Sequence, residues 1–127
     1  MGERQIEISA GDVIVTAVLN DSDTADELWA ALPITARGQT WGDEIYFSIP
    51  VSVEEAADSQ ETVEMGAVGY WPPGSALCLF WGPTPTSAPG EIRPASAVNV
   101  MGLIDGDPTV LGGVADGTEV VVARMDE

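Results

Sequence analysis

The sequence contains no histidine and no lysine, and four arginines are the only cationic side chains among its 127 residues. Without histidine the chain can form no Ser-His-Asp or Cys-His catalytic group, no histidine-ligated metal site and no imidazole base. Its 21 Asp and Glu residues give a net charge of −17. Nucleic acids and anionic membranes are bound through Lys and Arg, so we expect neither as a partner.

Cysteine is almost absent as well. Cys78 is the single cysteine, so no disulfide can form within the chain, and its place in the apolar run 76–80 predicts a buried thiol rather than a reactive nucleophile. The longest apolar stretches are far shorter than the roughly 18 residues of a membrane span. The first residues lead directly into an alternating segment without the apolar region of a signal peptide. We therefore expect a cytoplasmic protein.

The acidic residues are dispersed along the chain and form no acidic tail. Hydrophobic residues make up 45% of the sequence and the mean hydropathy is +0.13, which indicates a folded body under the charge. Such a one-sided surface repels itself at ordinary ionic strength, whereas 1 M salt shortens the Debye length to about 3 Å. The excess of acid, with no lysine, predicts a surface adapted to a salt-rich, halophilic environment.

Most of the chain has strand patterns separated by turns. Alternation over residues 4–9 and a β-branched run over 13–19 predict an opening hairpin. The 14 glycines and 9 prolines gather in turn-forming clusters between the later strand segments. These segments are predicted at residues 34–36, 44–51, 76–81, 97–104 and 119–125. We expect a mainly β protein, a closed barrel of about eight strands in one domain over residues 1–127.

One segment has helical spacing. Residues 24–27 have the form of a capping box, and Pro33 ends the apolar pattern, which predicts a helix over about residues 24–32. A second short helix is predicted at either 53–58 or 109–114.

Every aromatic residue except Trp29 lies between positions 41 and 81. In the strand over 44–49, alternation places Glu44 and Tyr46 opposite the apolar face. Tyr70 and Trp71 precede two prolines, which predicts a stiff loop at the barrel edge. The rings form either an apolar groove for a peptide or small molecule, or core filling. The candidate binding residues are Trp41, Glu44, Tyr46, Tyr70, Trp71, Phe80 and Arg93.

No motif indicates a metal, a cofactor or a catalytic residue. Asp43 and Glu44 are adjacent, and residues 21–27 carry four acids, but the latter lack the glycine that a calcium loop requires. Phosphate-binding glycine loops and a G-x-S-x-G elbow are absent. Arg37 and Arg93 flank the aromatic segment, where each could pair with a surface carboxylate or hold an anionic group of a ligand.

Several blocks in one order resemble a known family. They are Thr40-Trp41-Gly42-Asp43-Glu44-Ile45-Tyr46-Phe47, Gly69-Tyr70-Trp71-Pro72-Pro73-Gly74, Ala76-Leu77-Cys78-Leu79-Phe80, Gly82-Pro83-Thr84-Pro85 and Pro94-Ala95-Ser96-Ala97-Val98-Asn99-Val100. Over essentially its whole length, the chain resembles the small prokaryotic cyclophilin-like domain family. The resemblance implies a minimal cyclophilin-like β-barrel of about eight strands, capped by short helices.

The resemblance also suggests peptidyl-prolyl isomerase activity, but the sequence departs from the cyclophilin pattern. Cyclophilins carry a Phe-His-Arg stretch, whose arginine polarises the prolyl amide, and a Gln-Gly-Gly-Asp-Phe stretch lining the proline pocket. This chain has no histidine, and residues 42–49 contain no arginine. We therefore favour a non-catalytic module that binds a peptide or small molecule. A weak isomerase or folding helper is the alternative, and a third possibility is an accessory domain, since related barrels occur in amide-hydrolysing enzymes.

Overall fold

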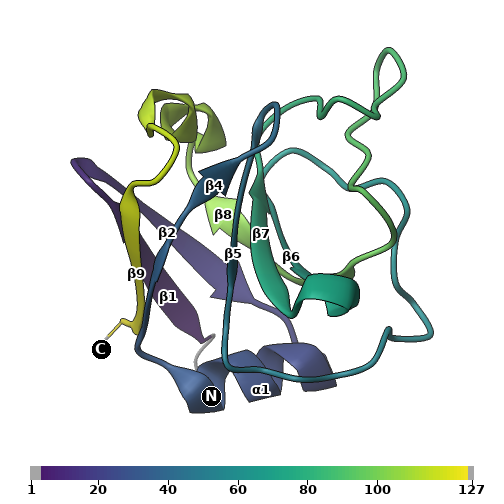
Figure 1. Cartoon of the computed structure of the whole chain (residues 1–127). Coiled ribbons are helices and arrows are strands. Elements are labelled where there is room, and N and C mark those ends of the chain that lie inside the picture. The colour runs from purple at the N-terminus through teal and green to yellow at the C-terminus, as the bar shows by residue number, and fades with distance from the viewer. Residues whose placement is uncertain (1–3, 126–127) are drawn as a thin grey trace.

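The computed structural model describes residues 4–125, which form one curved sheet of nine strands (Figure 1). The spatial order is β3-β9-β1-β2-β8-β6-β7-β5-β4, and all neighbouring strands are antiparallel. The strands are β1 (Gln5–Ala10), β2 (Val13–Leu19), β3 (Ile34–Arg37), β4 (Gln39–Thr40), β5 (Glu44–Ser48), β6 (Ala67–Trp71), β7 (Ala76–Phe80), β8 (Asn99–Asp105) and β9 (Glu119–Arg124).

The two edges of this sheet are consecutive in the chain. β3 pairs with β9 and β4 pairs with β5, and only Gly38 separates β3 from β4. A Cβ at Gly38 would lie 3.0 Å from side-chain atoms of both Ile45 and Val120, so glycine allows the close approach at this bend. The shared segment brings the sheet round into a nearly closed barrel. The predicted mainly β barrel is confirmed, with nine strands rather than about eight.

Short helices cover the two ends of the barrel (Figure 1). Helix α1 (Asp23–Ala31) buries Ala25 and Leu28 in the core at one end, and the 3₁₀ helix η2 (Pro108–Gly113) buries Leu111 at the other. The predicted capping box is wrong: Ser22 is the N-cap and accepts a hydrogen bond from the Ala25 amide. Ser22 lies two residues before the predicted motif, and Thr24 is buried instead.

Two further local predictions are wrong. Tyr70 and Trp71 are the last residues of β6 and not a loop, since the chain turns only at the following 3₁₀ helix η1 (Pro72–Gly74). Residues 53–58 have no helix, whereas the alternative at 109–114 falls on η2. The strand predicted to reach residue 51 ends at Ser48, because beyond it the chain leaves the sheet at Pro50.

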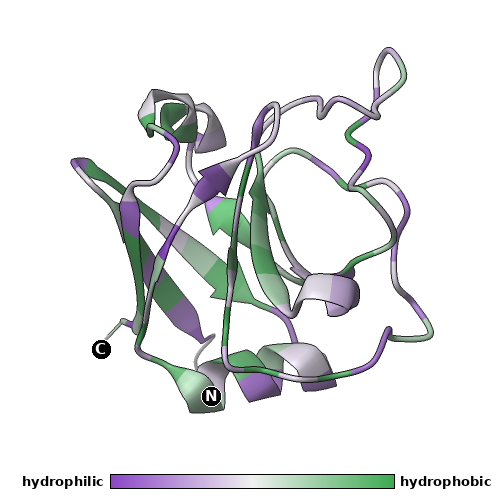
Figure 2. Cartoon of the chain, in the orientation of Figure 1, coloured by the Kyte–Doolittle hydropathy of each residue, from purple (hydrophilic) through white to green (hydrophobic). Residues whose placement is uncertain are grey.

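The β5-β7-β6 part of the sheet is buried on both faces. Its inner face joins the barrel core, and its outer face forms a second cluster that includes Cys78, Phe80 and Val98. The long connection between β7 and β8 passes over this outer face and is bridged at Val98 to Gln60. Hydrophobic residues accordingly follow the strands, while the connecting segments are mostly hydrophilic (Figure 2). Within residues 4–125, no helix has the length and apolar character of a membrane span.

Candidate functional site

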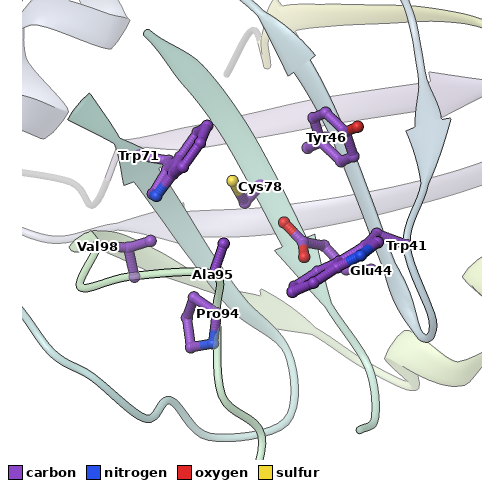
Figure 3. A pocket seen from close by; sticks show the side chains of 8 residues that line it. All are labelled: Trp41, Glu44, Tyr46, Trp71, Cys78, Pro94, Ala95 and Val98. Carbon is purple, nitrogen blue, oxygen red and sulfur yellow. The ribbon is translucent and has the colours of Figure 1, made fainter. Parts of the chain in front are cut away.

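A pocket of about 130 Å³ lies between the outer face of β5 and β7 and the end of the connection that leads into β8 (Figure 3). Aromatic side chains from three places in the sequence form much of its wall. The floor is formed by β5 and β7, and the connection supplies the aliphatic side. The residues lining it are Trp41, Glu44, Tyr46, Trp71, Cys78, Pro94, Ala95 and Val98.

Glu44 differs from every other acidic residue that the structure describes. It is 4% exposed, whereas the remaining carboxylates in residues 4–125 are exposed or half-buried. Its carboxyl group points into the pocket between the Trp41 ring and the Cys78 thiol (Figure 3). Burial removes water from the charged form and raises the pKa of Glu44 from 4.5 to about 7, against a small lowering by a hydrogen bond from Cys78.

Cys78 stands beside this carboxyl on the facing strand, where its backbone pairs with Tyr46. Its thiol also lies 3.9 Å from the Ala76 carbonyl oxygen. The thiol is a weak donor, and the two acceptors within its reach are this carbonyl oxygen and the Glu44 carboxyl group. Burial, followed by the nearby charge of Glu44, raises the pKa of the Cys78 thiol well above its ordinary value. The predicted buried thiol is confirmed, and this protonation state makes it a poor nucleophile.

Trp71 is fixed on the opposite side of the pocket. Its indole N–H donates to the Ser96 hydroxyl over 2.6 Å, which ties β6 to the connection above it. Gly74 lies under the ring, because a Cβ at that position would be 2.8 Å from two ring carbons of Trp71. Only a residue without a side chain leaves the indole in its present place.

Trp41 and Tyr46 are held by the β4-β5 hairpin. The Tyr46 hydroxyl donates to the Gln39 side chain over 3.1 Å, and the Trp41 amide donates to the Glu44 carbonyl over 3.0 Å. The hairpin tip packs on the β7-β8 connection at Gly42, where a Cβ would lie 3.0 Å from the Pro83 carbonyl oxygen. Hydrogen bonds and packing within the chain therefore hold both sides of the pocket rim in place.

Comparison with known proteins agrees with this architecture. The family model described as cyclophilin-like matches residues 4–123. This chain belongs to the cyclophilin-like family. A solved structure, the solution structure of a hypothetical protein from Archaeoglobus fulgidus, is 43% identical, with a TM-score of 0.82 over 97% of this chain and 95% of that one. None of the curated proteins matches the sequence.

Within this cyclophilin-like barrel, four of the candidate binding residues come together: Trp41, Glu44, Tyr46 and Trp71 all line the pocket. The other three do not. Tyr70 lies on the inner face, where its hydroxyl donates to the Val51 carbonyl oxygen. Phe80 is on the outer face but fully buried beneath neighbouring side chains.

Arg93 also lies outside the pocket lining. Its guanidinium pairs with Glu91 at 2.8 Å and approaches Glu61 at 3.9 Å. Its backbone carbonyl accepts hydrogen bonds from the hydroxyls of Thr84 and Thr86. Arg93 thus stabilises the connection that carries Pro94. It is adjacent to the pocket residue Pro94 in the sequence, but it does not line the pocket.

Four lining residues were missed as site residues: Cys78, Pro94, Ala95 and Val98. Strand alternation could have found Cys78, which shares the outer face with Glu44 and Tyr46. The other three come from a connection whose path the sequence pattern does not predict. No group of three or more His, Cys, Asp or Glu side chains in residues 4–125 is placed to hold a metal ion.

Proposed function

We propose that this cyclophilin-like chain is a non-catalytic binding module that holds a peptide segment or a small organic molecule in the pocket on the outer face of β5 and β7. The observation that carries the proposal is the pocket itself: aromatic walls around a single buried carboxyl group. Ligand sites in proteins are typically concave and mostly apolar, with a few converging polar groups. This pocket has that composition.

The walls are held in place by the chain. Trp71 is bonded to Ser96, and Tyr46 to Gln39, so neither ring has to be ordered when a ligand enters. Fixed walls lower the entropy cost of binding. The volume of about 130 Å³ is close to the about 150 Å³ of an engineered apolar cavity that takes up benzene. It therefore suits one side chain or one small organic group.

The positions of the arginines favour binding over isomerisation. Rotation of an X-Pro bond has a barrier of about 18 to 20 kcal/mol, and a donor aimed at the amide is the main means of lowering it. Arg37 donates to the Gly117 carbonyl oxygen, and Arg93 is paired with Glu91. Neither supplies such a donor to the pocket.

The binding proposal is tested by heteronuclear NMR in molar KCl, with a library of small organic fragments and short peptides added to the isotope-labelled chain. We expect hits that shift the amides of Glu44, Cys78 and Val98, and loss of these shifts in Trp71→Ala. Trp29→Ala is the matched control, because the Trp29 ring lies against Arg4 and Arg124 and does not line the pocket. The absence of any hit at the pocket would refute the proposal.

A protease-coupled prolyl isomerisation assay in molar KCl tests the alternative. We expect no turnover above the uncatalysed rate. Turnover that is lost in Arg37→Ala or Arg93→Ala would show that one of these arginines reaches a prolyl substrate, and the chain would then be an isomerase.

The surface charge supports a second part of the proposal, adaptation to high salt. Apart from Glu44 and the half-buried Glu91, all acidic residues in the described part of the chain are exposed. Salt would screen their mutual repulsion. We expect the melting temperature to rise from salt-free buffer to molar KCl at neutral pH, and an unchanged melting temperature would contradict salt adaptation.

A further inference from the structure

The buried carboxyl of Glu44 has no charged partner. The other buried polar side chains are paired within the chain: Asn99 donates to Thr24, and Thr84 donates to the Arg93 carbonyl oxygen. Among residues 4–125, Glu44 has only the weak thiol donor of Cys78. A nearby cation would strongly stabilise the charged form of a carboxylate in this setting, because burial has already removed the water that would otherwise solvate it.

The chain cannot supply that cation from its own side chains. Its four arginines are the only Lys, Arg or His residues in the sequence, and the structure places all four outside the pocket lining. Two of them, Arg4 and Arg124, lie over Trp29. The other two are bonded to Gly117 and Glu91. A positive charge at Glu44 must therefore come with a ligand.

The walls around Glu44 suit a particular kind of cation. Ring faces attract positive charge, and alkylated ammonium groups are commonly recognised by aromatic residues combined with a carboxylate. Trp41 and Trp71 flank the carboxyl from two sides, with Tyr46 completing the wall (Figure 3). A metal ion would gain little here, because the lining offers one carboxyl and mostly apolar surface instead of several oxygen ligands.

We propose that the ligand of this pocket carries a cationic nitrogen, an alkylammonium or methylated ammonium group whose charge is met by the Glu44 carboxylate and whose carbon substituents pack on the aromatic rings. The inference rests on the proposed binding function and names its ligand chemistry. A free amine and the side chain of a lysine in a peptide share this chemistry.

Two probes of nearly identical shape separate charge from shape. Choline carries a trimethylammonium group, and 3,3-dimethylbutan-1-ol has carbon in place of that nitrogen and is neutral. Each is titrated into the labelled chain in molar KCl, with choline chloride replacing KCl at constant chloride concentration. We expect choline to shift the Glu44, Cys78 and Trp71 signals. The neutral alcohol should bind at least about tenfold more weakly, because it lacks the positive charge that the carboxylate and the ring faces attract.

Variants test whether the preference for choline over the neutral alcohol arises at the pocket. Glu44→Gln keeps the shape and removes the charge, so choline should bind at least about tenfold more weakly, with little change for the neutral alcohol. Glu7→Gln is the matched control, because Glu7 is an exposed acid on β1 and does not line the pocket. It should leave both affinities unchanged. Two further probes then test whether a peptide side chain is accepted. They are lysine amide acetylated at the ε-nitrogen and the same amide with a free ε-amine.

A pH series gives an independent readout. The titratable groups lining the pocket are Glu44 and Tyr46 from β5 and Cys78 from β7, and the pKa of the thiol lies well above its ordinary value. Only ionised Glu44, with a pKa of about 7, should hold the cation. Choline affinity should therefore rise about tenfold from pH 6 to pH 8 as the competent fraction grows. In Glu44→Gln it should stay flat.

The outcomes distinguish the two proposals. Equal choline affinity in Glu44→Gln and the unmodified chain would overturn the assignment of the charge contact to Glu44. Equal binding of choline and the neutral alcohol would overturn the ammonium inference and leave a neutral-ligand pocket. Binding of other fragments at the pocket while neither probe binds would do the same. If no fragment, peptide or probe shifts the pocket signals, the proposed binding function fails as well.

Discussion

The two faces of the β5-β7-β6 sheet are both buried, yet they are built differently. The inner face carries Ile45, Phe47 and Leu79 among other apolar side chains of the barrel core. Its one polar group, the Tyr70 hydroxyl, donates to the Val51 carbonyl oxygen over 2.8 Å and accepts from the Val53 amide over 3.3 Å. The outer face instead carries Glu44, whose carboxyl opens into a pocket.

The Tyr70 hydroxyl stabilises the fold, whereas the Glu44 carboxyl does not. A buried hydroxyl with two partners stabilises the connection to which it is bonded. A buried carboxyl without a charged partner costs stability, because the folded state must desolvate its charge. Glu44 therefore has no stabilising role at neutral pH, and the proposed role toward a ligand would account for its position.

The largest expected effect lies on the inner face. Phe47 is 2% exposed, and Phe47→Ala should lower the free energy of unfolding by about 3 to 5 kcal/mol through lost burial and a cavity. Tyr46→Ala, one position along the strand, removes a half-buried side chain from the outer face and should cost only about 1 kcal/mol. Urea denaturation in molar KCl measures both. Equal losses would show that the two faces contribute alike to the fold.

Glu44 should give the next largest effect, visible as a pH dependence. Its pKa is about 7 in the folded chain against 4.5 ordinarily, so the unfolded chain loses this proton first as the pH rises. The contribution of Glu44 to stability therefore falls between pH 4.5 and 7 by about 3 kcal/mol, at about 1.4 kcal/mol per pH unit, and stays level above pH 7.

Glu44→Gln removes this loss. The variant should gain stability relative to the unmodified chain as the pH rises from 4.5 to 8, measured by urea denaturation at constant KCl. Glu7→Gln controls for the change in net charge. A constant difference between Glu44→Gln and the unmodified chain over this range would mean that the carboxyl is well solvated, and the contrast between the faces would disappear.

Tyrosine hydroxyls occur on both faces and allow the same substitution in two settings. Tyr70→Phe should lower the free energy of unfolding by about 1 to 3 kcal/mol, because the Val51 carbonyl oxygen loses its buried donor. The Tyr46 hydroxyl donates to the exposed side chain of Gln39. The free energy of unfolding of Tyr46→Phe should therefore stay within about 0.5 kcal/mol of that of the unmodified chain. Denaturation midpoints at a single pH are sufficient, and a reversed order would contradict the assignment of Tyr70 to the core.

Much of this fold was predictable from local patterns. Alternation over residues 44–49 predicted which side chains face the core, since a strand has a period of two. It failed at Tyr70 and Trp71, because β6 is buried on both faces along most of its length and shows no alternation. The closure at Gly38 was likewise not predicted, since it depends on two strands that meet only in the folded barrel.

The candidate site was predictable only on its strand side. Glu44 and Tyr46 follow from alternation, and Trp41 from its place beside them. Pro94 and Val98 reach the pocket through a connection held by hydrogen bonds such as Trp71 to Ser96. Such contacts join residues far apart in sequence, so no local pattern contains them.

The smallest expected effect concerns the ring that the connection holds. Gly74→Ala adds a methyl group 2.8 Å from the Trp71 ring, so the indole must shift away from the position in which it lines the pocket. The inner face does not touch this position, and we expect the free energy of unfolding to change little while choline affinity drops a few-fold. Gly113→Ala is the matched control, because a Cβ there meets open space. Unchanged affinity in Gly74→Ala would mean that Trp71 contributes no wall to the bound state, and the outer face would then bind through Glu44 and the β4-β5 hairpin alone.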